Sequence, residues 1–162
     1  MKHYAGLLQK SIAVVTPNKL ANSGLFSFYK QLKDSALKGN TRFLYETNVG
    51  AGLPVVQTLK NLIHSGDQIH RIEAMLSGTL SYIFNTFNSG VSFREVVAEA
   101  KALGYTEPDP RDDLSGKDMA RKILILARES GLELEPDDVD TQNILPEKCL
   151  SAPSVDAFLE SL

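Results

Sequence analysis

The fold is decided by a stretch in which a strand, a loop with two glycines and a helix follow one another: Arg42-Phe-Leu-Tyr-Glu-Thr-Asn-Val-Gly-Ala-Gly-Leu-Pro54. Its first five residues, Arg42 to Glu46, predict a strand. Pro54 suits the first position of a helix, and apolar residues at helical spacing continue from Val55 to Ile63. Strands that alternate with helices are typical of α/β organisation.

The segments upstream repeat this alternation. The β-branched run Ser11 to Val15 predicts a buried strand that Thr16-Pro-Asn18 ends. Apolar residues from Leu25 to Leu37 recur at helical spacing until Gly39-Asn40, and Tyr4 to Lys10 predicts a short helix at the start.

The segments downstream are mostly helical. Ser92-Phe-Arg-Glu95 is a capping box, in which a serine and a glutamate satisfy the first N–H groups of a helix. Periodicity predicts helices over Thr79–Phe87, Ser92–Leu103, Ser115–Glu129 and Val155–Leu159, and strands over Ile69–Leu76 and Val139–Leu145.

Composition excludes several classes of protein. The 162 residues are 43% hydrophobic and carry a net charge of −3, so they can bury a core but have no basic surplus for nucleic acid. Ile123–Ala127, the longest nearly apolar run, is too short to cross a membrane. Cys149 is the single cysteine, which excludes an internal disulfide and favours a cytoplasmic location.

The loop Asn48-Val-Gly-Ala-Gly-Leu53 admits three interpretations. The dinucleotide fingerprint fails because Val55 stands where its third glycine is required. A tight structural turn is the first interpretation. A cation site built from backbone carbonyls and Glu46 is the second, and a phosphate loop is the third.

A second candidate is the acidic stretch Glu107-Pro-Asp-Pro-Arg-Asp-Asp-Leu-Ser-Gly-Lys-Asp118. Its prolines and its misplaced glycine exclude a helix-loop-helix calcium site, which leaves a rigid functional loop or an acidic surface loop with capping aspartates. Asp118 and Lys122 share one face of the next helix. They form either an exposed ion pair worth ~0.3 to 0.5 kcal/mol or a half-buried catalytic pair, since Ile125 lies on the same stripe.

The remaining candidate is Lys19, which follows the first strand at the edge where open α/β sheets bind ligands, or is an ordinary surface lysine. The three histidines have no metal-ligand spacing, and we find no Ser/His/Asp triad.

Taken together, four segments resemble homoserine dehydrogenase, in order and at the family's separations, over about Ser11 to Leu150. The segment Tyr105-Thr-Glu-Pro-Asp-Pro-Arg-Asp-Asp-Leu-Ser-Gly116 is similar in sequence to the corresponding segment of the bifunctional aspartate kinase/homoserine dehydrogenases. The segments are Thr16-Pro-Asn-Lys19, Tyr45-Glu-Thr-Asn-Val-Gly-Ala-Gly-Leu-Pro54, Leu76-Ser-Gly-Thr-Leu-Ser-Tyr82 and Gly104 to Asp118 with Arg121-Lys122.

The resemblance implies the NAD(P)-dependent interconversion of aspartate 4-semialdehyde and homoserine, a step toward threonine and methionine. It implies that Lys122 and Asp118 are catalytic and that Lys19 lies near the nicotinamide of NAD or NADP. The substrate-binding residues that it implies are Glu107, Asp113 and Thr79. The residues that it implies for a monovalent cation, sodium or potassium, are Glu46, Val49, Ala51 and Leu53.

The implied fold is α+β with α/β-like parts. It consists of a mixed β-sheet covered by helices on one face, plus the last strand-helix-strand edge of a Rossmann-type nucleotide-binding domain. On this basis residues 1–45 form the incomplete nucleotide-binding edge. Residues 46–150 form the substrate, catalytic and dimerisation domain, and 151–162 form a tail. Nothing before Ser11 supplies the glycine-rich cofactor motif, so we expect a fragment that is inactive alone and dimerises through its sheet.

Two alternatives come from other classes. The chain could serve only as a non-catalytic dimerisation module of the same enzyme. It could also be a cation- or phosphate-dependent enzyme that uses the Gly50-Ala-Gly52 loop.

Overall fold

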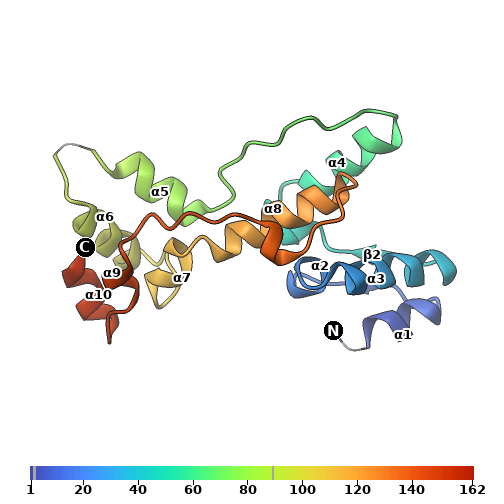
Figure 1. Cartoon of the computed structure of the whole chain (residues 1–162), viewed down its shortest axis with the longest axis horizontal. Helices are drawn as coiled ribbons and strands as arrows, with labels where there is room; N and C mark the ends of the chain where they lie inside the picture. The colour runs from blue at the N-terminus through green and yellow to red at the C-terminus, as the bar shows by residue number, and fades with distance from the viewer. Residues whose placement is uncertain (2, 89) are drawn as a thin grey trace. The chain divides into compact units, whose positions relative to one another are not determined.

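The computed structural model describes residues 1, 3–88 and 90–162, which form two compact units (Figure 1). Unit 1 consists of Met1–Ile72 and Ala120–Asp140, and unit 2 of Glu73–Met119 and Thr141–Leu162. The helix α8, Lys117–Glu129, contributes residues to both. No helix among the described residues is long and apolar enough to cross a membrane.

Unit 1 is organised around a strand-helix-strand segment. Strand β1 (Val14–Val15) pairs in parallel with β2 (Phe43–Leu44), with Val14 opposite Phe43. The helices of this unit besides α8 are α1 (Tyr4–Gln9), α2 (Leu20–Ser23), α3 (Phe26–Lys38), the 3-10 turn η1 (Glu46–Asn48), α4 (Val55–His64) and the 3-10 turn η2 (Pro136–Asp138). Both upstream strands and the helix between them are therefore confirmed, although each strand is only two residues long. The predicted burial of the first strand is wrong except at Val14, because the rest of the segment 11–15 is exposed.

The two faces of this small sheet differ in exposure. Val14 and Phe43 are buried, whereas Val15 is 77% and Leu44 is 41% exposed. Successive residues of a strand point to opposite faces, so one face lies in the core of unit 1 and the other presents apolar side chains outward. On the buried face the ring of Phe43 lies 4.9 Å from that of Tyr45.

A buried guanidinium holds the end of α8 in unit 1. The side chain of Arg128 has no exposed surface. Its Nη1 donates to the carbonyl of Asn22 at 2.7 Å, and its Nη2 donates to the carbonyls of Gly24 and Leu134, each at 2.7 Å. Arginine is the basic residue that can satisfy several carbonyls with one planar group. Arg128 therefore joins α8 to the end of α2 and to the segment before η2.

Unit 2 is a cluster of helices around one apolar core: α5 (Gly78–Thr86), α6 (Phe93–Ala102), α7 (Pro110–Leu114), α9 (Glu147–Leu150) and α10 (Val155–Ser161). The predicted capping box is present, since Ser92 Oγ accepts from Glu95 N–H and the Glu95 carboxylate accepts from Ser92 N–H at 2.9 Å. The apolar core of unit 2 is formed by Leu80, Ile83, Val96, Val97, Ala100, Leu114, Leu145, Cys149 and Phe158.

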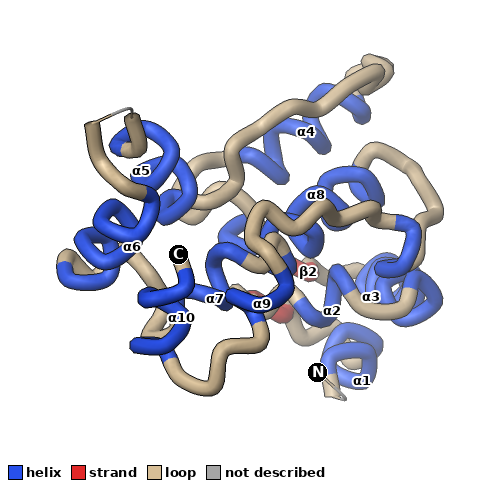
Figure 2. Tube along the Cα trace, turned by 60° about the vertical axis from the view of Figure 1, so that its left-hand side comes forward, coloured by secondary structure: helices blue, strands red, loops and turns tan. Residues whose placement is uncertain are grey.

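The predicted strands at 69–76 and 139–145 are wrong. Both segments are irregular chain, drawn as loop in Figure 2, and Leu145 is their only buried residue. An apolar run becomes a strand only where a neighbouring strand satisfies its backbone groups, and β1 with β2 forms the only sheet among the described residues. The mixed sheet is therefore not formed by these residues. The coarser prediction of helices with a small sheet is confirmed.

Candidate active site

The side chain of Arg111 holds the acidic segment 107–118 in place. Asp109 accepts from the backbone N–H of Arg111 at 3.0 Å and caps α7, and the Arg111 guanidinium donates to the same carboxylate from Nε and Nη2. Nη1 of Arg111 donates to the carbonyl of Ala152 at 2.6 Å. The hydrogen bonds from Arg111 hold the pKa of the Asp109 carboxyl below its ordinary value. The segment is thereby tied to the last part of the chain.

Three predicted substrate-binding residues lie together in unit 2. Asp113 Oδ2 accepts from the backbone N–H of Glu107 at 2.8 Å, and its Oδ1 lies 3.1 Å from Thr79 Oγ1. The same hydroxyl lies 2.6 Å from the carbonyl of Tyr105, so its single proton is shared between two acceptors. Asp113 therefore fixes the local backbone, while the side chain of Glu107 is exposed.

The predicted catalytic pair lies on α8. Asp118 and Lys122 are one helical turn apart and both are half-buried, and Ile125 on the same stripe is fully buried. The expectation that this face is not freely solvated is confirmed. Asp118 belongs to unit 2 and Lys122 to unit 1.

Lys19 lies where the sequence predicted, just beyond the carboxyl end of β1. It precedes α2, and its carbonyl accepts from the N–H groups of Asn22 and Ser23, each at 2.9 Å. Its side chain is half-buried.

Glu46 is the first residue of the segment 46–53, which is called the glycine loop below, and its side chain caps α4. Its Oε1 accepts from the N–H of Val56 at 2.8 Å, and its Oε2 accepts from the N–H of Gln57 at 2.9 Å. Both oxygens are thus used to satisfy the start of a helix, where a negative charge is stabilised. A cation held by this loop would therefore be bound by backbone carbonyl oxygens, which suit hard ions.

The loop itself has a strained backbone at its centre. Gly50 has φ of +82° and Ala51 has φ of +52°, in the left-handed region. A Cβ on Gly50 would lie 2.5 Å from Cγ2 of Val55, whereas one on Gly52 would meet nothing within 4 Å. Val49 is fully buried and Leu53 is 66% exposed. Among the described residues no group of three His, Cys, Asp or Glu side chains could hold a metal ion.

Two buried asparagine side chains, Asn22 and Asn48, link the glycine loop to the end of β1. Asn22 Nδ2 donates to Asn48 Oδ1 at 2.8 Å, and Asn48 Nδ2 donates to the carbonyl of Thr16 at 3.2 Å. Both amides are fully buried, and Asn22 Oδ1 has no hydrogen-bond partner among the residues that the structure describes.

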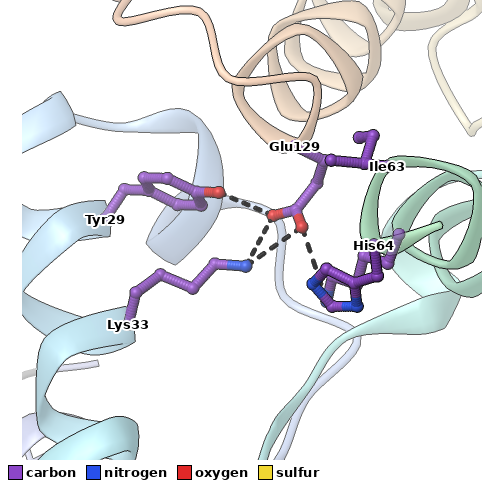
Figure 3. A pocket seen from close by; sticks show the side chains of 6 residues that line it. Tyr29, Lys33, Ile63, His64 and Glu129 are labelled. Carbon is purple, nitrogen blue, oxygen red and sulfur yellow. Dashed lines mark hydrogen bonds and ion pairs between the residues drawn. The ribbon is translucent and has the colours of Figure 1, made fainter. Parts of the chain in front are cut away.

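Sequence reasoning missed a cluster of charged and phenolic groups around Glu129, the last residue of α8 (Figure 3). The side chain of Glu129 is 3% exposed, and Lys33 Nζ lies 2.8 Å from its Oε1. Tyr29 donates to Oε1 at 2.7 Å, Tyr45 donates to the same oxygen, and Lys60 Nζ lies 3.5 Å from Oε2. The residues Tyr29, Lys33, Lys60, Ile63, His64 and Glu129 line a pocket of about 410 Å³.

Burial and charge shift the pKa values in this cluster. Burial, followed by the charge of Glu129, raises the pKa of Tyr29 and of Tyr45 far above 10.0. Burial lowers the pKa of Lys33, against the attraction of Glu129. Burial pushes the pKa of Glu129 up, but the charges of Lys33 and Lys60 and the hydrogen bonds from Lys33 and Tyr45 together outweigh it, so the net shift is downward. The two tyrosines therefore stay neutral, and the net effect of the surroundings favours the ionised form of Glu129.

The comparisons with known proteins agree on one family. The family model described as homoserine dehydrogenase matches residues 54–158. A bifunctional aspartokinase/homoserine dehydrogenase from Zea mays is 52% identical over 160 residues, which are 99% of this chain and 17% of that protein.

Solved structures agree with this match. A crystal structure of a Candida auris protein of unknown function has a TM-score of 0.91 and 39% identity, and the match covers 98% of this chain and 46% of that one. A hyperthermophilic archaeal homoserine dehydrogenase in complex with NADPH has a TM-score of 0.68 and 32% identity over 80% of this chain and 39% of that one. The chain thus spans only part of each relative. From the matching model and these identities, the chain belongs to the homoserine dehydrogenase family.

Proposed function

We propose that a full-length enzyme carrying this chain interconverts aspartate 4-semialdehyde and homoserine with NAD or NADP. The observation that carries the proposal is the 52% identity across 99% of the chain to a bifunctional aspartokinase/homoserine dehydrogenase. By full-length enzyme we mean a protein of the length of such relatives that contains residues 1–162.

In this proposal Lys122 and Asp118 do the proton chemistry. The ammonium of Lys122 protonates the oxygen of the aldehyde as negative charge develops on it, and in the reverse direction the amine accepts the hydroxyl proton. Asp118, one turn away on α8, stabilises the ammonium and holds it in place. Their half-burial supports this role, because a partly dry face strengthens both interactions.

The acids of unit 2 would bind the substrate ammonium. The exposed carboxylate of Glu107 is available to it, and Asp113 fixes the backbone from which Glu107 projects. Thr79 completes the arrangement through its hydroxyl. A backbone held in this way keeps the carboxylate of Glu107 near the place where the substrate ammonium would bind.

Residues 1–45 would be the last strand-helix-strand edge of a Rossmann-type nucleotide-binding domain, ahead of a substrate domain at 46–150 and a tail at 151–162. The parallel pairing of β1 with β2 across α3 supports this, as does the exposed face of Val15 and Leu44, which further chain could cover. Lys19 fits a cofactor site, because it lies at the carboxyl edge of parallel strands. A nicotinamide cofactor bound there supplies the hydride chemistry.

The glycine loop would hold sodium or potassium through carbonyls of Glu46, Val49, Ala51 and Leu53. The left-handed backbone at Gly50 and Ala51, which redirects successive carbonyls, supports this assignment.

We further propose a homodimer, formed through the substrate domain. The irregular segment 69–76, whose Met75 is 54% exposed, is the part of the substrate domain that we expect to pair with a second copy.

The test is homoserine-dependent reduction of NAD or NADP by the full-length enzyme, measured beside Lys122→Ala. Lys117→Ala is the matched control, because Lys117 is an exposed lysine of the same helix. Loss of roughly 10²-fold or more in turnover is expected for Lys122→Ala and none for the control. No oxidation of homoserine by the wild-type enzyme, or equal turnover in all three proteins, would refute the proposal.

A further inference from the structure

Glu129 is the point at which three separate parts of unit 1 meet. Tyr29 and Lys33 reach it from α3, Lys60 from α4 and Tyr45 from the segment after β2. Three hydrogen-bond donors, Tyr29, Lys33 and Tyr45, and the ammonium of Lys60 converge on one carboxylate that is 3% exposed. A buried carboxylate with this many donors has one arrangement, so it fixes the elements that carry the donors.

Two of these contacts lead directly to the glycine loop. Tyr45 precedes Glu46, whose carboxylate caps α4 at Val56 and Gln57. Lys60, one turn further along α4, lies 4.3 Å from the centre of the Tyr45 ring. The residues on both sides of the loop are therefore tied to the same carboxylate, and a change in the loop that moves Tyr45 or α4 must also move Glu129.

Glu129 is in turn linked to the proposed catalytic lysine through α8. Lys122 and Glu129 are seven residues apart, which is two helical turns, so both lie on one face of the helix. Both belong to one continuous helix, and Leu124, Ile125 and Leu126 between them are buried, so this interval of α8 moves as one rigid piece. A shift of Glu129 is therefore transmitted to Lys122.

We propose that Glu129 is a positioning residue that couples the glycine loop to Lys122, so that a monovalent cation bound by the loop raises turnover through Tyr45, Glu129 and α8. This inference rests on the proposed function. It concerns a residue that touches neither the proposed substrate acids nor Lys19 among the contacts described above. The carboxylate acts by holding the helix, not by exchanging a proton with substrate.

The experiment measures kcat and the KM for homoserine of the full-length enzyme in rising NaCl or KCl, with choline chloride keeping the ionic strength constant. Glu129→Gln and Tyr45→Phe are the test variants. Glu133→Gln is the matched control, because Glu133 is an exposed carboxylate just beyond α8. The wild type and the control should be activated by the cation. Glu129→Gln should lose most of this activation and roughly 10-fold in kcat, with KM changed by less than about twofold.

Tyr45→Phe separates positioning from loss of folding. It removes one donor to Glu129 and keeps the charges of Glu129, Lys33 and Lys60. It should reduce cation activation in the same direction even at temperatures far below its melting point. If both effects are positional, the double variant will show less than the product of the two single losses.

The outcomes are distinct. A wild-type enzyme that oxidises homoserine while both variants keep full kcat and full cation activation overturns the coupling and leaves the proposed function intact. A wild-type enzyme whose turnover is independent of sodium and potassium also overturns the coupling. A wild-type enzyme that never oxidises homoserine overturns both.

Discussion

The backbone N–H of Glu107 donates to Oδ2 of Asp113 across 2.8 Å, so one acid of the proposed substrate site holds the backbone from which another projects. Oδ1 of the same carboxylate lies 3.1 Å from the hydroxyl of Thr79. Both oxygens of Asp113 are therefore engaged within the protein. Its role would be to orient Glu107 as much as to attract the substrate.

Replacement of Asp113 should weaken substrate binding more than it slows chemistry. In Asp113→Ala both acceptors are removed, so the N–H of Glu107 and the hydroxyl of Thr79 lose this partner, at a cost of about 1 to 3 kcal/mol. The KM for homoserine should rise by roughly 10-fold or more. Asp112→Ala is the control, because the neighbouring Asp112 is exposed. Steady-state kinetics of both variants check this, and equal KM values would contradict it.

Loss of Asp118 should affect turnover far more than stability. As an ordinary ion pair with Lys122 it would be worth about 0.5 kcal/mol and its removal would leave catalysis nearly unchanged. As a group that holds the catalytic ammonium, its replacement in Asp118→Ala should reduce turnover by roughly 10²-fold. The measurement is turnover at saturating cofactor and homoserine, beside a melting curve. Turnover near that of the wild type would mean that Asp118 forms only an ordinary ion pair with Lys122 and has no catalytic role.

The two loop glycines should differ sharply. Gly50→Ala places a side chain in a left-handed conformation and against Val55, and should cost about 1 to 2 kcal/mol or more in the free energy of unfolding. Gly52→Ala has open space around its Cβ and should change it by less than about 0.5 kcal/mol. Urea denaturation of both variants measures the difference, and similar midpoints would show that the loop is not constrained at Gly50.

The ionised state of Glu129 should make stability depend on pH. Burial raises the pKa of Glu129, but the attraction of Lys33 and Lys60, with the hydrogen bonds from Lys33 and Tyr45, outweighs it and brings the pKa below 4.5. A carboxyl whose folded pKa is depressed contributes stability above the unfolded pKa, and this contribution is lost as the pH falls through the folded value. The free energy of unfolding should therefore fall below about pH 4.5 in the wild type.

Glu129→Gln cannot titrate at this position, so its free energy of unfolding should fall less steeply over the same range. Denaturant unfolding at a series of pH values, with Glu133→Gln as control, gives both slopes. Parallel slopes in the wild type and Glu129→Gln would mean that other carboxyls dominate the acid transition.

The sequence predicted the helices well because local signals define them. The helix at 92–103 has its own capping box, and the helix after Pro54 has an apolar stripe and a proline at its start. The strands at 69–76 and 139–145 could not be judged in this way, because a strand depends on a partner elsewhere in space and apolar runs alone do not show whether one exists.

The candidate site was predictable only in part. The acidic stretch and the glycine loop attract notice through composition, and the structure does bring Thr79, Glu107 and Asp113 together. The cluster at Glu129 joins residues up to 100 positions apart, which no local pattern reveals. Its only local signals are Tyr29 and Lys33 one turn apart and a carboxylate at the end of an apolar helix.

The seven-residue separation of Lys122 and Glu129 also restricts how the length of the chain can change. One residue inserted between them would turn Glu129 by ~100° away from the face of Lys122. The helix could then no longer place Glu129 in the buried cluster and Lys122 in the proposed catalytic site at the same time. An insertion of four residues would restore the direction to within roughly 40° but displace the cluster by ~6 Å along the axis. Substitutions in this interval should therefore be tolerated far more readily than insertions or deletions of any size.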